Sequence, residues 1–468
     1  MYLKSSEALV HRPLNNGLPE NQEDVASEME LLKTLTAKAE LLWQLYQKRM
    51  EKALLEEAFR HYQFIDELIL NARQSYLEDN SKHYLAEKSH EIFGRAIRVA
   101  ATLFRENGEQ KYLEAAFAFM ESNKATALLE SLKENEARMF TRLRETARGK
   151  VLLREEEKLK MEIAGFRRSL YETEQKQSEK IKQINAALFE RKEAFSKVRK
   201  QLEEEFPEYY KLKYDPGVAT IKQLQAEILA ADERLVQYYV NKNLLICLVV
   251  GSNYADIFEL EVTEAQYQAL ETFLRQISSF SFYQEAELAF SEFTQAAFAV
   301  YSMLIEPIEE GLPRTGSKLI IVPDGLINFV SFQALLSRLP EDENKIDYSL
   351  NNLSYLLEDY QIRYAYSASQ LAFFRKKNQS RSKQKGFVGF APYFGEGNDV
   401  ADARRTCEEE NLAPLTENEY EVRAIAKLVN GKSYIGEKAN VSVFKKVADQ
   451  CSILHLATYD CAQADAPL

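Results

Sequence analysis

The segment KLIIVPDGLINFVSFQALL, residues 318–336, decides the fold of this chain. Its apolar beginning predicts a short buried strand, and Pro323 ends that strand because proline has no N–H group to donate to a sheet. Asp324 and Gly325 then predict a turn. Asp324 has two interpretations at this point: a turn residue, or a carboxylate that faces a substrate.

Strand-like runs lie on both sides of this segment. Residues 234–260 read as strands joined by tight turns, and helices are predicted over about 264–278 and 284–306. Downstream, short apolar strands alternate with helices, which predicts an α/β layer with a mostly parallel sheet. The strand-like runs are YQIRYAYS (360–367), GFVGFAP (386–392), SYIG (433–436) and SILHLAT (452–458), and the helix-like ones are ASQLAFFRK and ENEYEVRAIAKLV.

The first part of the chain, residues 1–147, reads as helix after helix. The pentapeptide LEEAF at 55–59 recurs as LEAAF at 113–117. A small Ala beside a bulky Phe suits stacked helical hairpins, and the pattern resembles degenerate tetratricopeptide repeats. An ordinary helical bundle is the alternative.

Residues 148–212 predict a coiled coil or a long antiparallel helical hairpin with a linker, because charged residues alternate with apolar ones at helical steps. The polar segment ETEQKQSEK, 172–180, is the expected tip. The α/β region then occupies residues 213–468. Within it, the basic stretch RKKNQSRSKQK (375–385) is predicted as a solvated loop, with an acidic partner or a cleavage-prone loop as alternatives.

Composition excludes several classes of protein. The net charge of -12 argues against a nucleic-acid-binding surface, and no apolar window is long enough for a transmembrane helix. The four Cys form no CxxC and no disulfide framework, and the N-terminus lacks the apolar core of a secretory signal. We therefore expect a cytoplasmic protein. No Gly-rich phosphate loop occurs, and no cofactor is expected.

Four segments, taken in order, resemble the CHAT domain, a caspase-like peptidase domain found with tetratricopeptide repeats in bacteria. They are LIIVPDGLINFVSFQALL, IRYAYSAS, FVGFAP and the terminal ILHLATYD, and they lie downstream of helices that resemble the repeats of such proteins. The resemblance implies a helical solenoid followed by a caspase-like α/β/α domain. It also implies a Cys–His dyad, in which a thiolate attacks a peptide carbonyl and the His moves the proton.

The strand ILHLATYD departs from the family pattern H-x-A-x-H-G, in which the second His is catalytic. Tyr459 holds the catalytic position, and Asp460 replaces the Gly. Tyrosine, with an ordinary pKa near ~10, is a poor base at neutral pH. His455 would lie ~13 Å from Tyr459 at ~3.3 Å per strand residue, and we interpret it as a buried structural histidine.

The nucleophilic Cys of the family stands in a Ser-Ala-Cys context, which this sequence does not contain. We expect that position beyond Leu468, so that the α/β domain is incomplete at its C-terminus and strand 452–458 is an exposed edge. Cys461 lies on the wrong element to replace the nucleophile. Cys451, His455 and Cys461 lack the spacing of a structural zinc site, and no metal is expected.

Three hypotheses follow. The first is a catalytically incompetent pseudopeptidase that acts in protein–protein interaction or regulation, with protein or peptide partners bound through the helical repeats. The second is a fragment of an active caspase-like cysteine endopeptidase, and the third is a purely structural scaffold. The sequence indicates no nucleic-acid or membrane partner, and it leaves the oligomeric state open.

Overall fold

A computed structural model represents the chain. It describes residue 18 and residues 28–75, 79–124, 143, 146–172, 178–214, 218–278, 286–312, 316–340, 350–380, 386–393, 415, 417–448 and 451–458. The chain divides into two compact units, Met1–Phe373 and Phe374–Leu468. The predicted order, a helical region followed by an α/β region, is confirmed.

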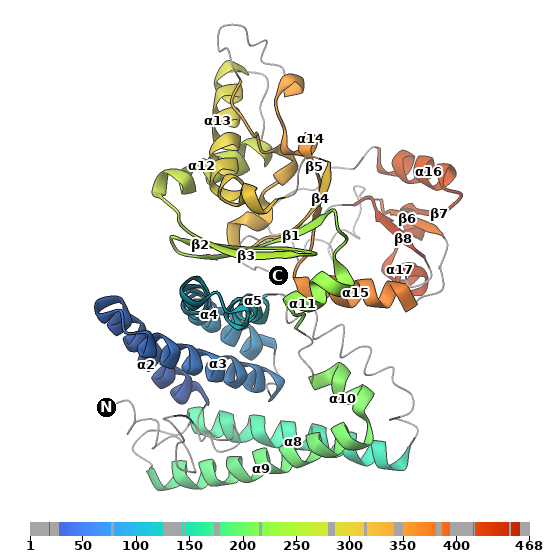
Figure 1. Ribbon diagram of the computed structural model, residues 1–468. Helices are drawn as coiled ribbons and strands as arrows, with labels where there is room; N and C mark the ends of the chain where they lie inside the picture. Colours follow the sequence, from blue (N-terminus) through green and yellow to red (C-terminus); the bar gives the residue numbers. More distant parts are fainter. Residues whose placement is uncertain are drawn as a thin grey trace. The chain divides into compact units, whose positions relative to one another are not determined.

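The first unit is built on a five-stranded sheet with the strand order β3-β2-β1-β4-β5 (Figure 1). The strands are β1 (Glu233–Asn241), β2 (Leu244–Gly251), β3 (Tyr254–Glu261), β4 (Ser317–Val322) and β5 (Tyr360–Tyr364). The first three form an antiparallel meander, as the tight turns predict. β4 lies parallel to β1, and β5 lies parallel to β4.

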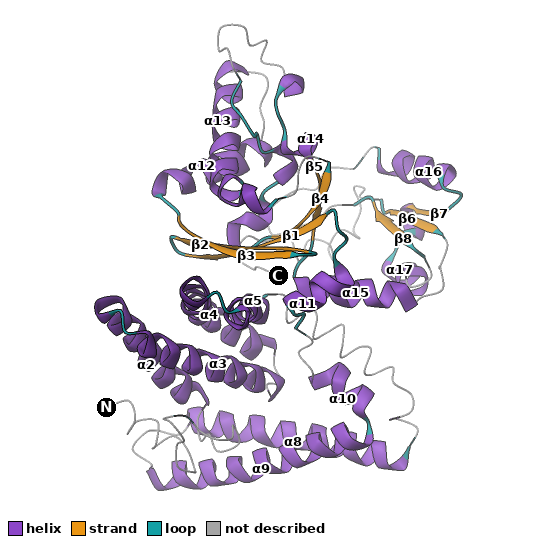
Figure 2. Cartoon of the chain, viewed as in Figure 1, coloured by secondary structure: helices purple, strands orange, loops and turns teal. Residues whose placement is uncertain are grey.

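Side chains of β1 alternate between two hydrophobic cores. Leu235 and Tyr239 belong to the core shared with the N-terminal helices, whereas Val236 and Tyr238 belong to the core on the opposite face. The sheet therefore lies between two helical layers (Figure 2). One layer comprises α2 (Glu28–Arg49), α3 (Lys52–Ser75), α4 (Asp79–Asn107) and α5 (Gln110–Asn123), and the other comprises α12 (Glu264–Ser278) and α13 (Ala286–Leu304).

The N-terminal helices pack in antiparallel pairs, α2 with α3 and α4 with α5. The repeated pentapeptide lies near the start of α3 and of α5. Ala58 and Ala116 are fully buried there, next to buried Phe side chains. This is the small-beside-bulky arrangement that the sequence predicts, while the tetratricopeptide assignment stays a prediction. None of the described helices is long and apolar enough to cross a bilayer.

Two long helices, α8 (Ala147–Glu172) and α9 (Ser178–Glu205), pack against each other around a core of their own. This is the predicted hairpin, although residues 173–177 of its expected tip lie outside the described residues. Glu28 of α2 accepts from Arg167 at 2.8 Å and lies 2.7 Å from Lys192. Burial alone would raise the pKa of Glu28, but these two cations outweigh burial and hold the pKa at about 2.

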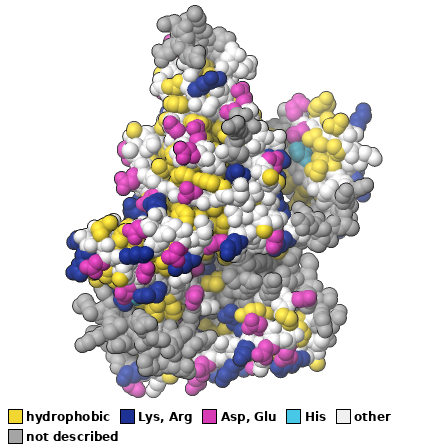
Figure 3. Space-filling model, viewed as in Figure 1, with side chains coloured by type: hydrophobic (Ala, Val, Ile, Leu, Met, Phe, Trp, Pro, Cys, Tyr) yellow, Lys and Arg dark blue, Asp and Glu magenta, His cyan; other side chains and the backbone are white. Residues whose placement is uncertain are grey.

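The second unit contains a three-stranded sheet with the order β7-β6-β8, in which all strands are parallel. Its elements are β6 (Phe387–Ala391), α16 (Asn418–Leu428), β7 (Lys432–Ile435), α17 (Val441–Val447) and β8 (Ile453–Leu456). Among the described strands β8 is an edge, as predicted, and the side chains of Ile453 and Leu456 are exposed. Hydrophobic side chains gather on the visible face of this unit (Figure 3).

One element runs across the division between the units: α15 (Ala368–Ser380). The predicted loop over 375–385 is therefore wrong for 375–380, because Arg, Lys and Gln are good helix formers and extend the helix. Residues 381–385 lie outside the described ones. The shorter elements are α10 (Pro207–Tyr214), α11 (Ile221–Gln223) and α14 (Leu356–Asp359).

Candidate functional site

Asp324 lies where the parallel strand pair β1 and β4 ends. β4 stops at Val322, while β1 continues to Asn241. Beyond the last paired carbonyl, the Asp324 carboxylate accepts from the N–H of Val240 at 2.8 Å and so continues the ladder with a side chain. The predicted turn is confirmed, since Gly325 has a left-handed φ of 54°, which costs a glycine nothing.

Lys124, just past the end of α5, binds this strand end from the helical layer. Its ammonium lies 3.6 Å from a carboxylate oxygen of Asp324 and donates to the carbonyl of Pro323. Only 3% of the side chain is exposed. Burial lowers the pKa of Lys124, while the carboxylates of Asp324 and Glu121 oppose that shift.

Glu121, one turn earlier on α5, connects the helical layer to a third element. Its two carboxylate oxygens accept from the N–H groups of Ala368, at 3.1 Å, and Ser369, at 2.7 Å. These are the first N–H groups of α15, which have no partner within the helix and favour a negative charge. Gln237 of β1 donates to the same carboxylate at 2.8 Å.

His90 of α4 completes the network. Its Nδ1 lies 2.9 Å from the Asn123 amide nitrogen, which can only donate, so Nδ1 accepts and Nε2 carries the proton. Nε2 then donates to the carbonyl of Val240 at 2.8 Å. The His90 ring also stacks on Tyr239, with the centroids 4.8 Å apart.

This arrangement joins elements together, and its two central side chains, Glu121 and Lys124, are buried. Asp324 is engaged by Val240 and Lys124, which supports the structural interpretation of this residue. Lys124 is too enclosed to act as a nucleophile or a base toward a substrate. Sequence reasoning missed Glu121, Lys124 and His90, because their partners lie far away along the chain. The only available signal was a charged pair in ESNK, at the end of an apolar helix.

A second strand end lies in the other unit. The side-chain amide of Asn418, at the start of α16, donates to the carbonyls of Pro392, at 3.1 Å, and Ala457, at 3.3 Å. These carbonyls directly follow the parallel strands β6 and β8, and the carboxyl ends of such strands are where ligands bind in α/β folds. Sequence reasoning missed Asn418 as well, because a helix-initiating Asn carries no catalytic signature.

His455 is the third residue of β8 and lies opposite Gly389 of β6. Its ring stacks on Phe387, with the centroids 6.0 Å apart. Nε2 lies 3.0 Å from a carboxylate oxygen of Glu421, without the alignment of a hydrogen bond. The side chain is 29% exposed, so His455 is half-buried where the sequence predicts it to be buried. β8 is short and is an edge strand among the described strands, so its side chains are less fully covered than those of β6.

Tyr459, Asp460 and Cys461 lie outside the described residues, as does Cys407. Of the two described cysteines, Cys247 is fully buried in β2, and burial raises the pKa of its thiol far above the ordinary value. The thiol of Cys451, half-buried before β8, contacts the carbonyl of Ala448 at 3.5 Å. In the described part of the chain no cysteine pairs with a histidine, and no three His, Cys, Asp or Glu side chains gather as for a metal.

Comparison with known proteins identifies one region. The family model of the CHAT domain matches residues 294–467, from within α13 to beyond β8. The match supports the resemblance to this caspase-like family for residues 294–467 of the α/β region, and it includes both Asp324 and the strand of His455. It covers less than half of the chain and none of the N-terminal helices. No curated protein matches the chain.

Proposed function

We propose that the chain is a CHAT-domain protein whose caspase-like region is catalytically incompetent and acts in protein–protein interaction or regulation. One observation carries the proposal: the position that holds the catalytic His in the family pattern holds Tyr459 here. A phenol that ionises near pH ~10 cannot take a proton from a thiol efficiently at neutral pH.

The neighbouring histidine offers no replacement. His455 packs on Phe387 and faces Glu421 from the middle of β8. A general base must reach the nucleophile within hydrogen-bond distance, and no cysteine contacts His455 among the described residues. Cys247 is also unsuitable, because a buried thiol with a raised pKa holds its proton.

The contacts between helices and sheet support a role in interaction. Lys124 and Glu121, both in the N-terminal helical region, bind the end of β4 and the start of α15 directly. A partner on those helices would therefore act on elements of the region that the CHAT family model matches. We place this role in the cytoplasm, on the grounds of cysteine usage.

A thiol-reactive peptide probe tests the proposal. We expect an acyloxymethyl ketone peptide to label no cysteine of the reduced 468-residue chain, while iodoacetamide labels accessible thiols in the same sample. Tyr459→His should also remain unlabelled, because the sequence contains no Ser-Ala-Cys segment. Stoichiometric labelling of one cysteine, abolished when that cysteine becomes Ser, would identify an active cysteine peptidase and overturn the proposal.

A further inference from the structure

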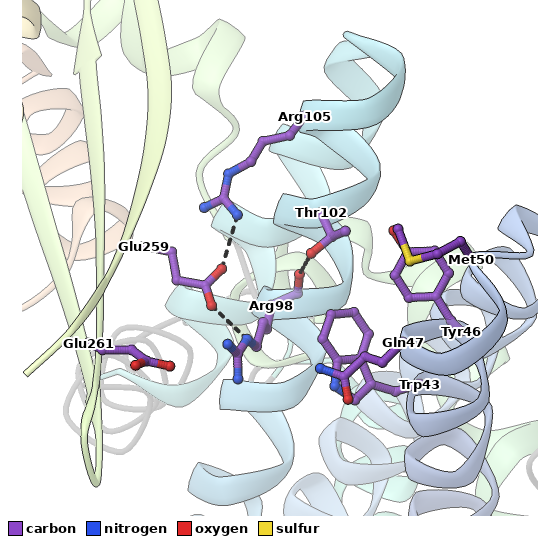
Figure 4. Close-up of a pocket in the computed structure, with 9 residues that line it drawn as sticks. All are labelled: Trp43, Tyr46, Gln47, Met50, Arg98, Thr102, Arg105, Glu259 and Glu261. Carbon is purple, nitrogen blue, oxygen red and sulfur yellow. Dashed lines mark hydrogen bonds and ion pairs between the residues drawn. The ribbon is translucent and has the colours of Figure 1, made fainter.

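A groove of about 500 Å³ lies between α2, α4 and β3 (Figure 4). β3 is the edge strand of the larger sheet. The groove is therefore bounded by the helical layer on one side and by the free edge of the sheet on the other. It is separate from the buried network around Lys124, with which it shares no residue.

One wall of the groove is aromatic and apolar and comes from α2. The rings of Trp43 and Tyr46 contact each other, with the centroids 5.7 Å apart. The hydroxyl of Tyr46 donates to Glu106, which satisfies the polar end of this side chain. Met50 extends the wall and is 68% exposed. Aromatic rings and a flexible thioether together suit an apolar side chain of variable shape.

The opposite wall carries two arginines, Arg98 and Arg105, that are arranged around one glutamate, Glu259. The carboxylate of Glu259 receives Arg98 at 2.6 Å and Arg105 at 3.0 Å, one on each oxygen. Two guanidinium groups thus share one carboxylate. Each guanidinium has five N–H donors, more than Glu259 can accept, and the Arg98 and Arg105 side chains are 37% and 44% exposed.

The same wall disfavours a cationic ligand. The guanidinium carbon of Arg98 lies 5.8 Å from the centre of the Trp43 ring, and so a protein cation already occupies the ring face that a ligand cation would use. A ligand carboxylate, in contrast, can take the remaining donors of Arg98 and Arg105 in a bidentate geometry.

We propose that this groove binds an acidic peptide segment, with a carboxylate on Arg98 and Arg105 and an adjacent apolar side chain on the wall formed by Trp43, Tyr46 and Met50. The inference rests on the proposed interaction role, to which it adds the chemistry of the partner. Glu261 lies at the rim, exposed and without an ion-pair partner in the described part of the chain. It weakens the attraction for an acidic ligand and provides a position where affinity can be raised.

The groove contains its own reporter, because Trp43 is the only tryptophan of the chain. We would titrate the 468-residue chain with the blocked peptide Asp-Glu-Leu-Phe-Glu and follow tryptophan fluorescence. The matched probes are the neutral Asn-Gln-Leu-Phe-Gln and the basic Lys-Arg-Leu-Phe-Lys. We expect saturable binding of the acidic peptide that weakens with added salt. Binding of the neutral peptide should be about tenfold weaker or worse.

Two substitutions with opposite expected effects on the affinity for the acidic peptide locate the site. Arg105→Gln should weaken the acidic peptide about tenfold, whereas Glu261→Lys should tighten it by a factor of about three. Arg95→Gln is the matched control: Arg95 lies on the same helix, is 42% exposed and pairs with Glu40 at 3.4 Å, outside the groove. It should leave the affinity unchanged. All three positions are partly or fully exposed, and the thermal midpoint of each variant checks that it folds.

Equal binding of the neutral or basic peptide would overturn the proposal, as would equal losses for Arg105→Gln and Arg95→Gln. Calorimetry with the acidic peptide covers the remaining outcome: heat of binding without a fluorescence change would place the peptide elsewhere and also overturn it. A negative result for peptide binding in the groove can be told apart from a negative result for the proposed function. The thiol-reactive probe tests the missing dyad in a separate sample and does not depend on any peptide in the groove.

Discussion

The ammonium group of Lys124 lies 3.6 Å from the carboxylate of Asp324, so that the end of α5 and the end of β4 meet through a buried pair of opposite charges. A pair of this kind has a large desolvation cost, and its removal as a pair is often tolerated. Removal of one partner alone is strongly destabilising, because the other charge is left buried and uncompensated. The helical layer and the sheet thus depend on each other at this point.

Lys124→Ala should therefore lower the free energy of unfolding by about 3–5 kcal/mol. The double variant Lys124→Met with Asp324→Leu should lose clearly less, because neither charge remains. Urea unfolding followed by Trp43 fluorescence measures both, since Trp43 belongs to the same helical layer. Lys111→Ala is the control, because the Lys111 side chain is 61% exposed in its pair with Glu109 and should change nothing measurable. A double variant as unstable as Lys124→Ala would contradict this account.

The contact of Glu28 with Arg167 and Lys192 predicts that the free energy of unfolding falls at acid pH. The pKa of Glu28 is about 2 in the folded chain, whereas the ordinary value that applies to the unfolded chain is 4.5. The unfolded chain therefore binds the proton first, and the contribution of Glu28 is complete above pH 4.5 and is lost as the pH falls toward 2. Glu28→Gln should cost about 2–3 kcal/mol at neutral pH, and wild type and variant should converge at the acid end of this window.

Denaturant unfolding at neutral pH and at both ends of this window measures the convergence. Glu30→Gln is the matched control: Glu30 lies in the same first turn of α2 but is 58% exposed and pairs only locally with Lys33. It should show no such pH dependence. A Glu28→Gln penalty that stays constant down to pH 2 would show that lost packing, and not the ionised carboxylate, is responsible.

How much could be predicted from the sequence depended on whether the signal was local. The run ending at Pro323 predicted β4 and its turn, because strand, proline and glycine signals are adjacent along the chain. Glu121 could not be assigned in this way, since it accepts from Ala368, 247 residues away. The groove was missed for the same reason: Trp43 and Glu259 lie on different elements, and each alone reads as an ordinary helix or strand residue.

A second close approach, in the smaller unit, depends on the absence of a side chain. A Cβ atom at Gly389 of β6 would lie 2.6 Å from a methyl group of Val422 on α16, so glycine allows this helix to lie close against the strand. Gly389→Ala should cost about 1–3 kcal/mol through overpacking. In a Val422→Ala background the same substitution should cost less, because the clashing methyl is gone. Thermal midpoints of the four proteins complete the double-mutant cycle, and strict additivity would exclude this contact as the cause.

The amide of Asn418, which donates to the carbonyls after β6 and β8, should determine how firmly β8 is held. Asn418→Ala should cost about 1–2 kcal/mol, because it removes two hydrogen bonds to the carbonyls at the strand ends, one of them buried. Asn418→Asp should cost more at neutral pH, since a carboxylate repels both carbonyl oxygens. That extra cost should disappear as the pH falls, because a carboxyl group in this environment has a raised pKa, and its protonated form can donate.

Hydrogen exchange of the β8 amides in the 468-residue chain measures this locally. Both Asn418 variants should exchange faster at Ile453–Leu456 than the wild type does. Asn440→Ala is the control: Asn440 also caps a helix of this unit, accepting from Val443 at 3.0 Å, and its amide donates to the carbonyl of Glu437 in the preceding turn. It should speed exchange in α17 and leave β8 unchanged. Unchanged exchange in β8 for Asn418→Ala would mean that the pairing with β6 alone holds the strand that carries His455.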